Sequence, residues 1–178
     1  MQPRMSHKAK SALRDFAARC RRLPPLANRK AGLHALIARD DASEGQQAVR
    51  FLADELKLDV QQVRLGAIQA KYAARTEHRL AKMLAQAEHK AVVLLFDEAD
   101  ALFGKRIDEH GAEESSAQDV ARFIVRRLGF YRGVAVVTAD RDSAVSVELR
   151  RRLEHVIELR FSDPDAGVDR QSEPVRDE

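Results

Sequence analysis

Short, uninterrupted apolar runs alternate with longer amphipathic stretches along this chain. The clearest runs are AVVLLF at 91–96 and VAVVT at 134–138, which are rich in β-branched residues and too short for typical helices. Such runs are typical of strands that are buried on both faces, as in a parallel sheet. We predict further strands at 32–38, 59–65 and 155–161.

Between these strands the apolar residues recur at helical spacing. The helices that this pattern predicts span 9–22, 46–56, 71–88, 99–103, 120–128 and 146–153. Pro24 and Pro25 end the first of them. The alternation of strands and helices indicates an α/β fold, in which a doubly wound parallel sheet carries helices on both faces in three layers.

Polar segments suggest how the chain is organised. We expect surface loops at 39–45 and 108–119. The segment 162–178 has almost nothing to bury, so we expect a disordered tail there. The predicted domain organisation is therefore a basic N-terminal helical segment at 1–30, an α/β core domain at 31–161 and this tail.

Composition narrows the class of protein. The 178 residues suit one domain, and 44% hydrophobic with 33% charged residues is ordinary for a globular protein. No stretch approaches the roughly 20 apolar residues of a membrane helix, and the N-terminus lacks the apolar part of a secretory signal. We therefore expect a cytoplasmic protein. The single cysteine, Cys20, rules out an internal disulfide and a cysteine-based metal cluster.

The net charge of +3 is unevenly distributed. Residues 1–30 contain nine Lys or Arg and one acid, Asp15. Such a segment is either a solvated helix face or a surface for nucleic acid, an acidic partner or a membrane. Because neither interleaved aromatic residues nor a known nucleic-acid motif accompanies these charges, we expect neither nucleic acid nor a membrane as the partner.

Two acids, Asp97 and Glu98, directly follow the apolar run at 91–96. Ligands bind at the carboxyl ends of the strands in open α/β sheets. Burying ionised acids there is costly unless a cation or a polarised water meets them. The pair is therefore a candidate metal and catalytic site. Alternatively, the two acids cap the predicted helix at 99–103, since carboxylates favour the amino end of a helix.

The segment FDEADALFGKR at 96–106 resembles the Walker B segment of AAA+ ATPases, above all bacterial single-domain members, and the resemblance covers about 32–161. It implies a P-loop NTPase-like fold with ATP and Mg²⁺ as cofactors. It also implies that Asp97 coordinates the metal and that Glu98 activates water.

The resemblance extends to three further motifs of the family. Asp140 takes the place of the family's polar sensor residue, usually Asn, which positions the attacking water. Arg151 and Arg152 match paired arginines that reach a neighbour's nucleotide in a ring; alternatively, they lie on a plain basic helix. Lys71 and Tyr72 match the loop that lines the central pore and grips a polypeptide; alternatively, Tyr72 packs as a helix residue.

The phosphate loop departs most from the family pattern, G-x-x-x-x-G-K-[ST], in which backbone N–H groups and a lysine hold the phosphates. Residues 39–46 preserve its length, but Arg39 and Glu44 replace the two glycines. The candidate cofactor-binding residues that remain are Asp41, Ser43, Gly45 and Gln46. Like charges 4 Å apart cost about 1 kcal/mol in water and several at a protein surface. Because three acids now face the phosphate position, we expect much weaker ATP binding.

The segment after the last predicted strand is too short for the helical lid of the family, so we expect no lid and weakened ring assembly. Three functions fit these patterns. The first is a pseudo-ATPase that binds or regulates a protein partner, such as an intact AAA+ subunit of a hetero-oligomer to which it offers Arg151 and Arg152. The second is an active ATPase that remodels proteins or complexes despite its atypical loop. The third is an adaptor that binds nucleic acid or an acidic partner through 4–30.

Overall fold

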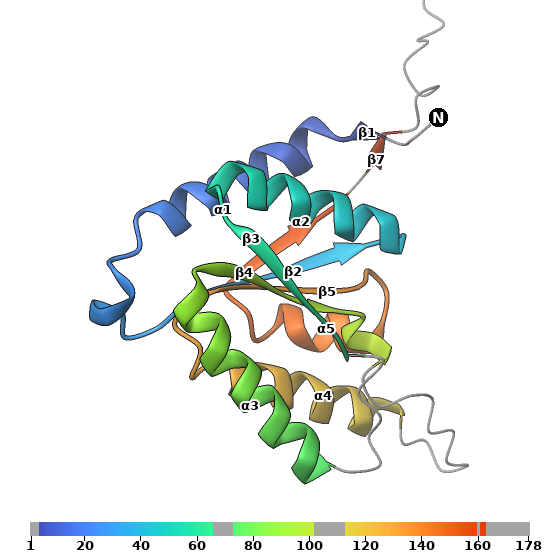
Figure 1. Ribbon diagram of the computed structural model, residues 1–178. Helices are drawn as coiled ribbons and strands as arrows, with labels where there is room; N and C mark the ends of the chain where they lie inside the picture. Colours follow the sequence, from blue (N-terminus) through green and yellow to red (C-terminus); the bar gives the residue numbers. More distant parts are fainter. Residues whose placement is uncertain (1–3, 66–72, 102–112, 160, 163–178) are drawn as a thin grey trace, which may run out of the picture.

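The computed structural model describes residues 4–65, 73–101, 113–159 and 161–162 (Figure 1). The elements, in chain order, are β1 (Arg4–Met5), α1 (His7–Arg21), η1 (Leu26–Asn28), β2 (Leu33–Arg39), α2 (Ala42–Leu56), β3 (Asp59–Arg64), α3 (Ala73–Lys90), β4 (Val92–Asp97), η4 (Ala99–Ala101), α4 (Glu113–Leu128), β5 (Val134–Asp140), α5 (Ala144–Arg150), β6 (His155–Glu158) and β7 (Phe161–Ser162).

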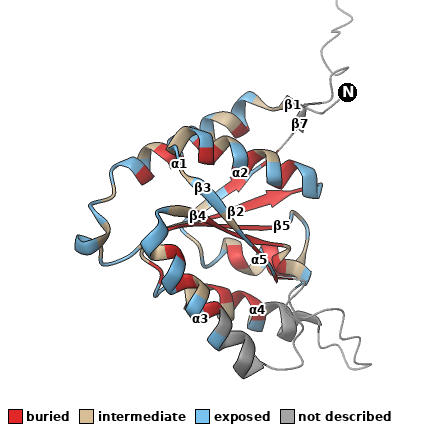
Figure 2. Ribbon diagram, viewed as in Figure 1, coloured by how far each residue is buried: buried red, intermediate tan, exposed pale blue. Residues whose placement is uncertain are grey.

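Five of these strands form one parallel sheet in the order β3-β4-β5-β2-β6. In Figure 1, α1 and α2 cover one face of the sheet, and α3, α4 and α5 cover the other. The doubly wound α/β fold that the sequence predicts is therefore confirmed. Figure 2 shows that the central strands are buried, which explains why β4 and β5 are continuously apolar.

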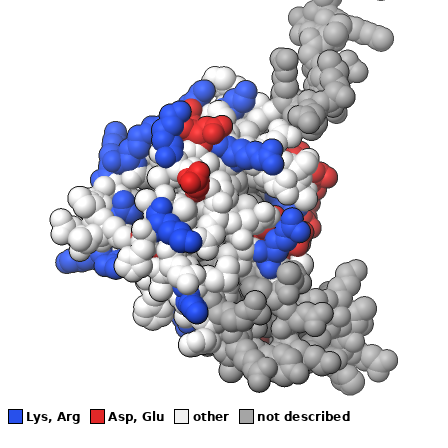
Figure 3. Space-filling view, viewed as in Figure 1, with Lys and Arg blue, Asp and Glu red and all other residues white. Residues whose placement is uncertain are grey.

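Helix α1 belongs to the packed core, although the sequence placed 1–30 outside the core domain. Its residues Leu13 and Phe16 are 0% and 3% exposed and pack in one cluster with residues of α2 and of the sheet. Lys and Arg side chains gather over this side of the molecule in Figure 3. Two of them, Arg14 and Arg21, form ion pairs with Glu55 of α2, at 3.3 and 3.1 Å. Part of the basic charge therefore fastens α1 to α2.

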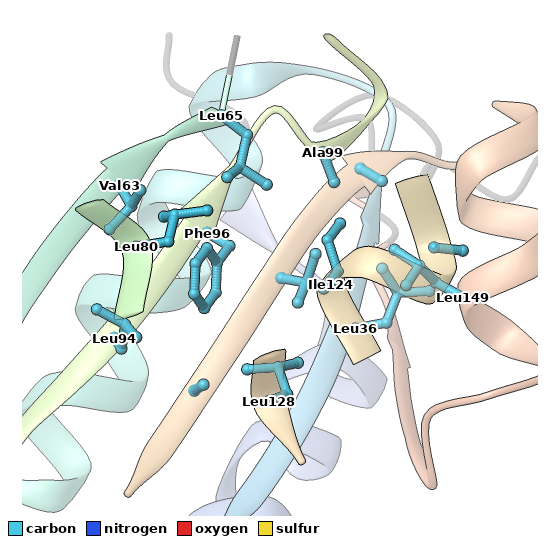
Figure 4. Packing of buried hydrophobic residues seen from close by; sticks show 14 of the residues in the cluster. Leu36, Val63, Leu65, Leu80, Leu94, Phe96, Ala99, Ile124, Leu128 and Leu149 are labelled. Carbon is cyan, nitrogen blue, oxygen red and sulfur yellow. The ribbon is translucent and has the colours of Figure 1, made fainter. Parts of the chain in front are cut away.

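The opposite face of the sheet carries a second cluster, which Figure 4 shows from close by. Leu36, Leu94 and Phe96 point from the strands toward Leu128 and other residues of the covering helices. Alternate residues of each central strand therefore enter different clusters, as the two-residue period of a strand requires.

The connection between β2 and α2 differs from the predicted loop at 39–45. Arg39 is the last residue of β2 and Ala42 the first of α2, so that only two residues separate them. The prediction failed because DASE at 41–44 is a helix start: Asp41 is the N-cap, and it forms a capping box with Glu44. The loop predicted at 108–119 also ends early, since α4 begins at Glu113.

The other predicted elements agree with the structure to within a few residues, apart from the predicted strand at 155–161, in which β6 ends at Glu158. Phe161–Ser162 instead pairs antiparallel with Arg4–Met5. The tail was predicted at 162–178; Ser162 instead belongs to β7, and residues 163–178 lie outside the described residues. Within the described part of the chain, no helix combines the length and the apolar character that crossing a membrane requires.

Replacing Leu13 by Ala tests whether α1 is part of the folding unit. Because Leu13 is fully buried, we expect the free energy of unfolding to fall by about 2–5 kcal/mol in urea titrations. Ser11→Ala, on the exposed side of the same helix, serves as the control and should change it by less than about 0.5 kcal/mol. A separate unfolding transition for the helix, with the remainder unaffected, would contradict this expectation.

Candidate functional site

Asp97, the predicted metal ligand, ends β4 and is 5% exposed. Its Oδ1 accepts hydrogen bonds from the Thr138 hydroxyl of β5 and from the Glu98 backbone N–H, at 3.0 Å for the latter. Its Oδ2 accepts one from Nε2 of Gln62 on β3, at 2.8 Å. Donors from both neighbouring strands therefore stabilise the carboxylate, which offsets the cost of burying it.

Glu98, the predicted water activator, lies in the turn that follows β4 and is half-buried. Its φ of 58° is in the left-handed region, which is unusual for a residue other than glycine. The turn leads directly into η4, and the Ala101 N–H donates to the Glu98 carbonyl at 2.9 Å. The two predicted catalytic acids are thus adjacent but differently placed, with only Asp97 fully buried.

Arg39, the last residue of β2, lies beside Asp140 in the sheet register. Its Nη1 donates to Oδ1 of Asp140 at 2.8 Å, and Arg39 is 4% exposed. Its side chain lies against the first turn of α2, as the short distance to Gly45 shows: a Cβ at that glycine would come within 2.8 Å of the Arg39 Cδ. Glycine at position 45 therefore leaves the space that the buried arginine fills.

The amino end of α2 is covered by the chain's own carboxylates. Oδ1 of Asp41 accepts from the Ser43 N–H at 2.7 Å. Oε2 of Glu44 accepts from the N–H groups of Asp40 and Asp41, at 3.0 and 3.3 Å. Negative charge is favourable at the positive end of a helix dipole, so these acids occupy a position that an anionic ligand would otherwise fill.

Arg141 fastens the short β2–α2 connection to the end of β5. Its Nε and Nη2 donate to the two carboxylate oxygens of Asp40 at 2.7 and 2.8 Å, and Nη2 also donates to the Leu159 carbonyl. The hydrogen bond with Asp40 raises the pKa of Arg141 from its ordinary value, although burial opposes this. This bidentate pair holds the turn against the strands beside it.

Asp140 also lies close to a second acid, Asp100 of η4. Partial burial is the largest cause that raises the pKa of Asp140, followed by the hydrogen bond with Asp100 and the charge of Asp100. The guanidinium of Arg39 acts in the opposite direction but does not cancel the rise. The Asp140 N–H in addition donates to Oδ1 of Asp100 at 3.3 Å.

The remaining predicted site residues lie apart from this cluster or outside the described residues. Ser43 and Gln46 are exposed in the first turns of α2. Arg151 and Arg152, just after α5, are exposed and pair with Glu148, at 3.0 and 3.6 Å. The predicted pore-loop residues Lys71 and Tyr72 lie outside the described residues. Among the residues that are described, no group of three His, Cys, Asp or Glu side chains is arranged to hold a metal ion.

The sequence did not show which residues contact Asp97 and Asp140. Gln62 and Thr138 contact Asp97, and Arg39 and Asp100 contact Asp140. Strand register and the turn after β4 bring these side chains together, so no local sequence pattern marks them. The capping box at 41–44 was the one readable signal.

Replacing Asp100 by Asn should lower the pKa of Asp140, because it removes a negative charge that raises it. The native protein holds this proton more readily than the unfolded chain, so ionised Asp140 costs stability above its native pKa. That cost is relieved as the pH falls from the pKa of Asp140 in the native protein toward its lower pKa in the unfolded chain. Carboxyl ¹³C NMR titration measures the pKa directly, and unfolding at several pH values should show a weaker pH dependence in the variant.

Asp142→Asn, at an exposed neighbouring position, is the matched control and should leave the pKa of Asp140 unchanged. An unaltered pKa of Asp140 in Asp100→Asn would show that the two carboxyl groups do not interact.

Comparisons with known proteins agree with this geometry. The model of the family described as "ATPase family associated with various cellular activities (AAA)" matches residues 47–161, more than half of the chain. The "ATPase family gene 2 protein" of Schizosaccharomyces pombe is 30% identical over 125 residues. The match covers 68% of this chain but only 16% of that protein, so the chain spans a small part of its relative. The matched region contains β3 to β6 with Asp97 and Glu98, and the chain therefore belongs to the AAA family as an ATPase core domain of P-loop NTPase-like fold.

Proposed function

We propose that this AAA-family domain is a pseudo-ATPase that acts through a protein partner. The observation that carries the proposal is the side chain of Arg39, which lies over Gly45 and pairs with Asp140 where the family holds nucleotide phosphates. A phosphate loop needs backbone N–H groups that are free to bind the ligand. Here a connection of two residues replaces such a loop.

The charges of the connection support the same proposal. The N–H groups of Asp40, Asp41 and Ser43 already donate to the carboxylates of Asp41 and Glu44. The nearby guanidiniums are neutralised as well, since Arg39 pairs with Asp140 and Arg141 with Asp40. A triphosphate would meet carboxylates and find no unpaired cation among these groups. The residues present therefore do not fit the nucleotide that the family normally binds.

Asp97 fits a structural role in this proposal. Both of its oxygens accept hydrogen bonds from Gln62, Thr138 or the Glu98 backbone, so its burial does not depend on a Mg²⁺ ion. The retained acid then holds the ends of β3, β4 and β5 together. The alternative function, an active ATPase with an unusual loop, is favoured by the position of Glu98 beside Asp97 at the end of β4.

The partner-directed part of the proposal rests on Arg151 and Arg152. Both are exposed after α5, and the carboxylate of Glu148 holds them side by side. The two guanidiniums share one carboxylate, so this exposed group keeps a positive charge that is available to a neighbouring subunit, where it can stabilise charge on a transferred phosphoryl group. We therefore propose an intact AAA+ subunit as the partner, in a hetero-oligomer.

Calorimetric titration with MgATP and MgADP tests nucleotide binding first. We expect no saturable heat at millimolar nucleotide and no rise in the thermal unfolding temperature. A ligand at a hundredfold excess over its Kd would stabilise the fold by about 2.7 kcal/mol, so thermal unfolding is a sensitive second readout. An intact AAA+ ATPase in the same buffer provides the positive control.

Micromolar binding that is lost in Asp97→Ala would contradict the pseudo-ATPase and favour the alternative function. Turnover by the pure chain that disappears in Glu98→Gln would then establish an active ATPase.

The double substitution Arg151→Ala and Arg152→Ala tests the partner-directed role. With an AAA+ subunit that co-purifies with the tagged chain, we expect the unmodified chain to raise the ATPase rate of that subunit. The double variant should keep binding but lose the stimulation, which for an arginine finger is on the order of 10³-fold or more. Arg122→Ala, an exposed arginine of α4, is the control. Stimulation that persists in the double variant would refute the finger role and leave the nucleotide result untouched.

A further inference from the structure

A cavity lies at the amino edge of the sheet, opposite the edge that carries Asp97 and Asp140. It has a volume of about 320 Å³ and is formed where α1, α2 and α3 end and where β4 and β5 begin. Figure 1 shows these ends on the same side of the molecule. Sites for small organic ligands commonly measure about 300–1,000 Å³, so this cavity has the size of a compact ligand.

Most of the cavity wall is apolar. Leu23 and Leu26 contribute from the segment after α1, and Leu56 and Leu58 from the end of α2 and the start of β3. Cys20 also faces the cavity, and burial raises the pKa of its thiol to about 12. The thiol is therefore neutral and a poor nucleophile, so the wall favours a ligand that binds without a covalent bond.

Tyr131 is a lining residue of the cavity, and its hydroxyl is buried with no hydrogen-bond partner in the described part of the chain. The residue is 1% exposed, and it lines the cavity beside Gly133. Its main chain is held by hydrogen bonds with Leu128 and with His34, at 2.9 and 3.1 Å. A Cβ at residue 133 would lie 2.5 Å from the Tyr131 Oη, so glycine is required there.

Arg29 adds a positive charge to the same cavity. Its Nε and Nη1 donate to the carbonyl oxygens of Pro24 and Arg132, at 2.6 and 3.2 Å, which orients the guanidinium without neutralising it. Glu88 is the one acid among the described lining residues, and it pairs with Arg132 at 3.2 Å. The charge of Arg29 lowers the pKa of both Tyr131 and Cys20, against the larger effect of burial, as expected of a cation close to both groups.

We propose that this cavity binds a small organic anion with an apolar body, whose carboxylate or sulfonate contacts Arg29. The leucines surround the apolar body, and the headgroup supplies the negative charge that Arg29 lacks. The site is separate from the carboxyl edge of the sheet, so it does not depend on whether the domain binds nucleotide.

Two fluorescent probes test the proposal, because they share an apolar body and differ in charge. 1-Anilinonaphthalene-8-sulfonate carries a sulfonate, and N-phenyl-1-naphthylamine is its neutral counterpart. We expect saturable one-to-one binding of the sulfonate to the full chain, about tenfold tighter than the neutral probe. Equal affinities, or no saturation in the millimolar range, would overturn the proposal.

Variants of the cavity assign the binding to Arg29. Arg29→Gln should weaken the binding of the sulfonate by about tenfold and leave that of the neutral probe unchanged, while Arg29→Lys, which keeps the charge, should keep most of the affinity. Arg22→Gln, an exposed neighbour that does not line the cavity, is the control. An equal loss in this control would refute the assigned site.

Discussion

The burial of Arg39 is the constraint on which the carboxyl edge of this domain depends. A guanidinium that is 4% exposed must have a counter-charge nearby, because an unpaired charge in the interior is strongly destabilising. Asp140 supplies that charge from the neighbouring strand, and Gly45 leaves the space that the arginine stem occupies. The turn that follows Arg39 is held by the Arg141–Asp40 pair, and the backbone N–H of Arg141 donates to the Arg39 carbonyl at 2.7 Å. These contacts close the edge with internal charges.

The proposed loss of nucleotide binding is compatible with an intact AAA-family fold. The parallel sheet and the acid at the end of β4 are present, and protein donors satisfy the buried carboxylate of Asp97. The hydrogen bonds that a nucleotide would receive at the start of α2 are instead made by Asp41 and Glu44. The exposed arginines after α5 are the feature through which we propose that the domain serves a partner.

The arginines at the two edges of the sheet therefore differ in whether a carboxylate pairs with them. At the carboxyl edge, Arg39 and Arg141 are each paired with a carboxylate. At the amino edge, Arg29 is held only by carbonyl oxygens in the described chain. An anion lowers the free energy most where a cation has no carboxylate partner. By this argument the amino edge is the better candidate for binding small molecules, although ligands of α/β sheets generally bind at the other edge.

The sequence by itself determined the secondary structure of the centre of the sheet and the position of the acid pair. The runs at 91–96 and 134–138 are apolar without interruption because both faces of these strands are covered, and that pattern is local. The start of α2 was also encoded locally, as the capping box at 41–44, and was predicted wrongly because the segment was taken for a phosphate loop. Only the tertiary structure decided that Arg39 meets Asp140 and that Thr138 meets Asp97. These residues are 101 and 41 positions apart, and they meet because strand order and register bring them to the same edge, which no local pattern specifies.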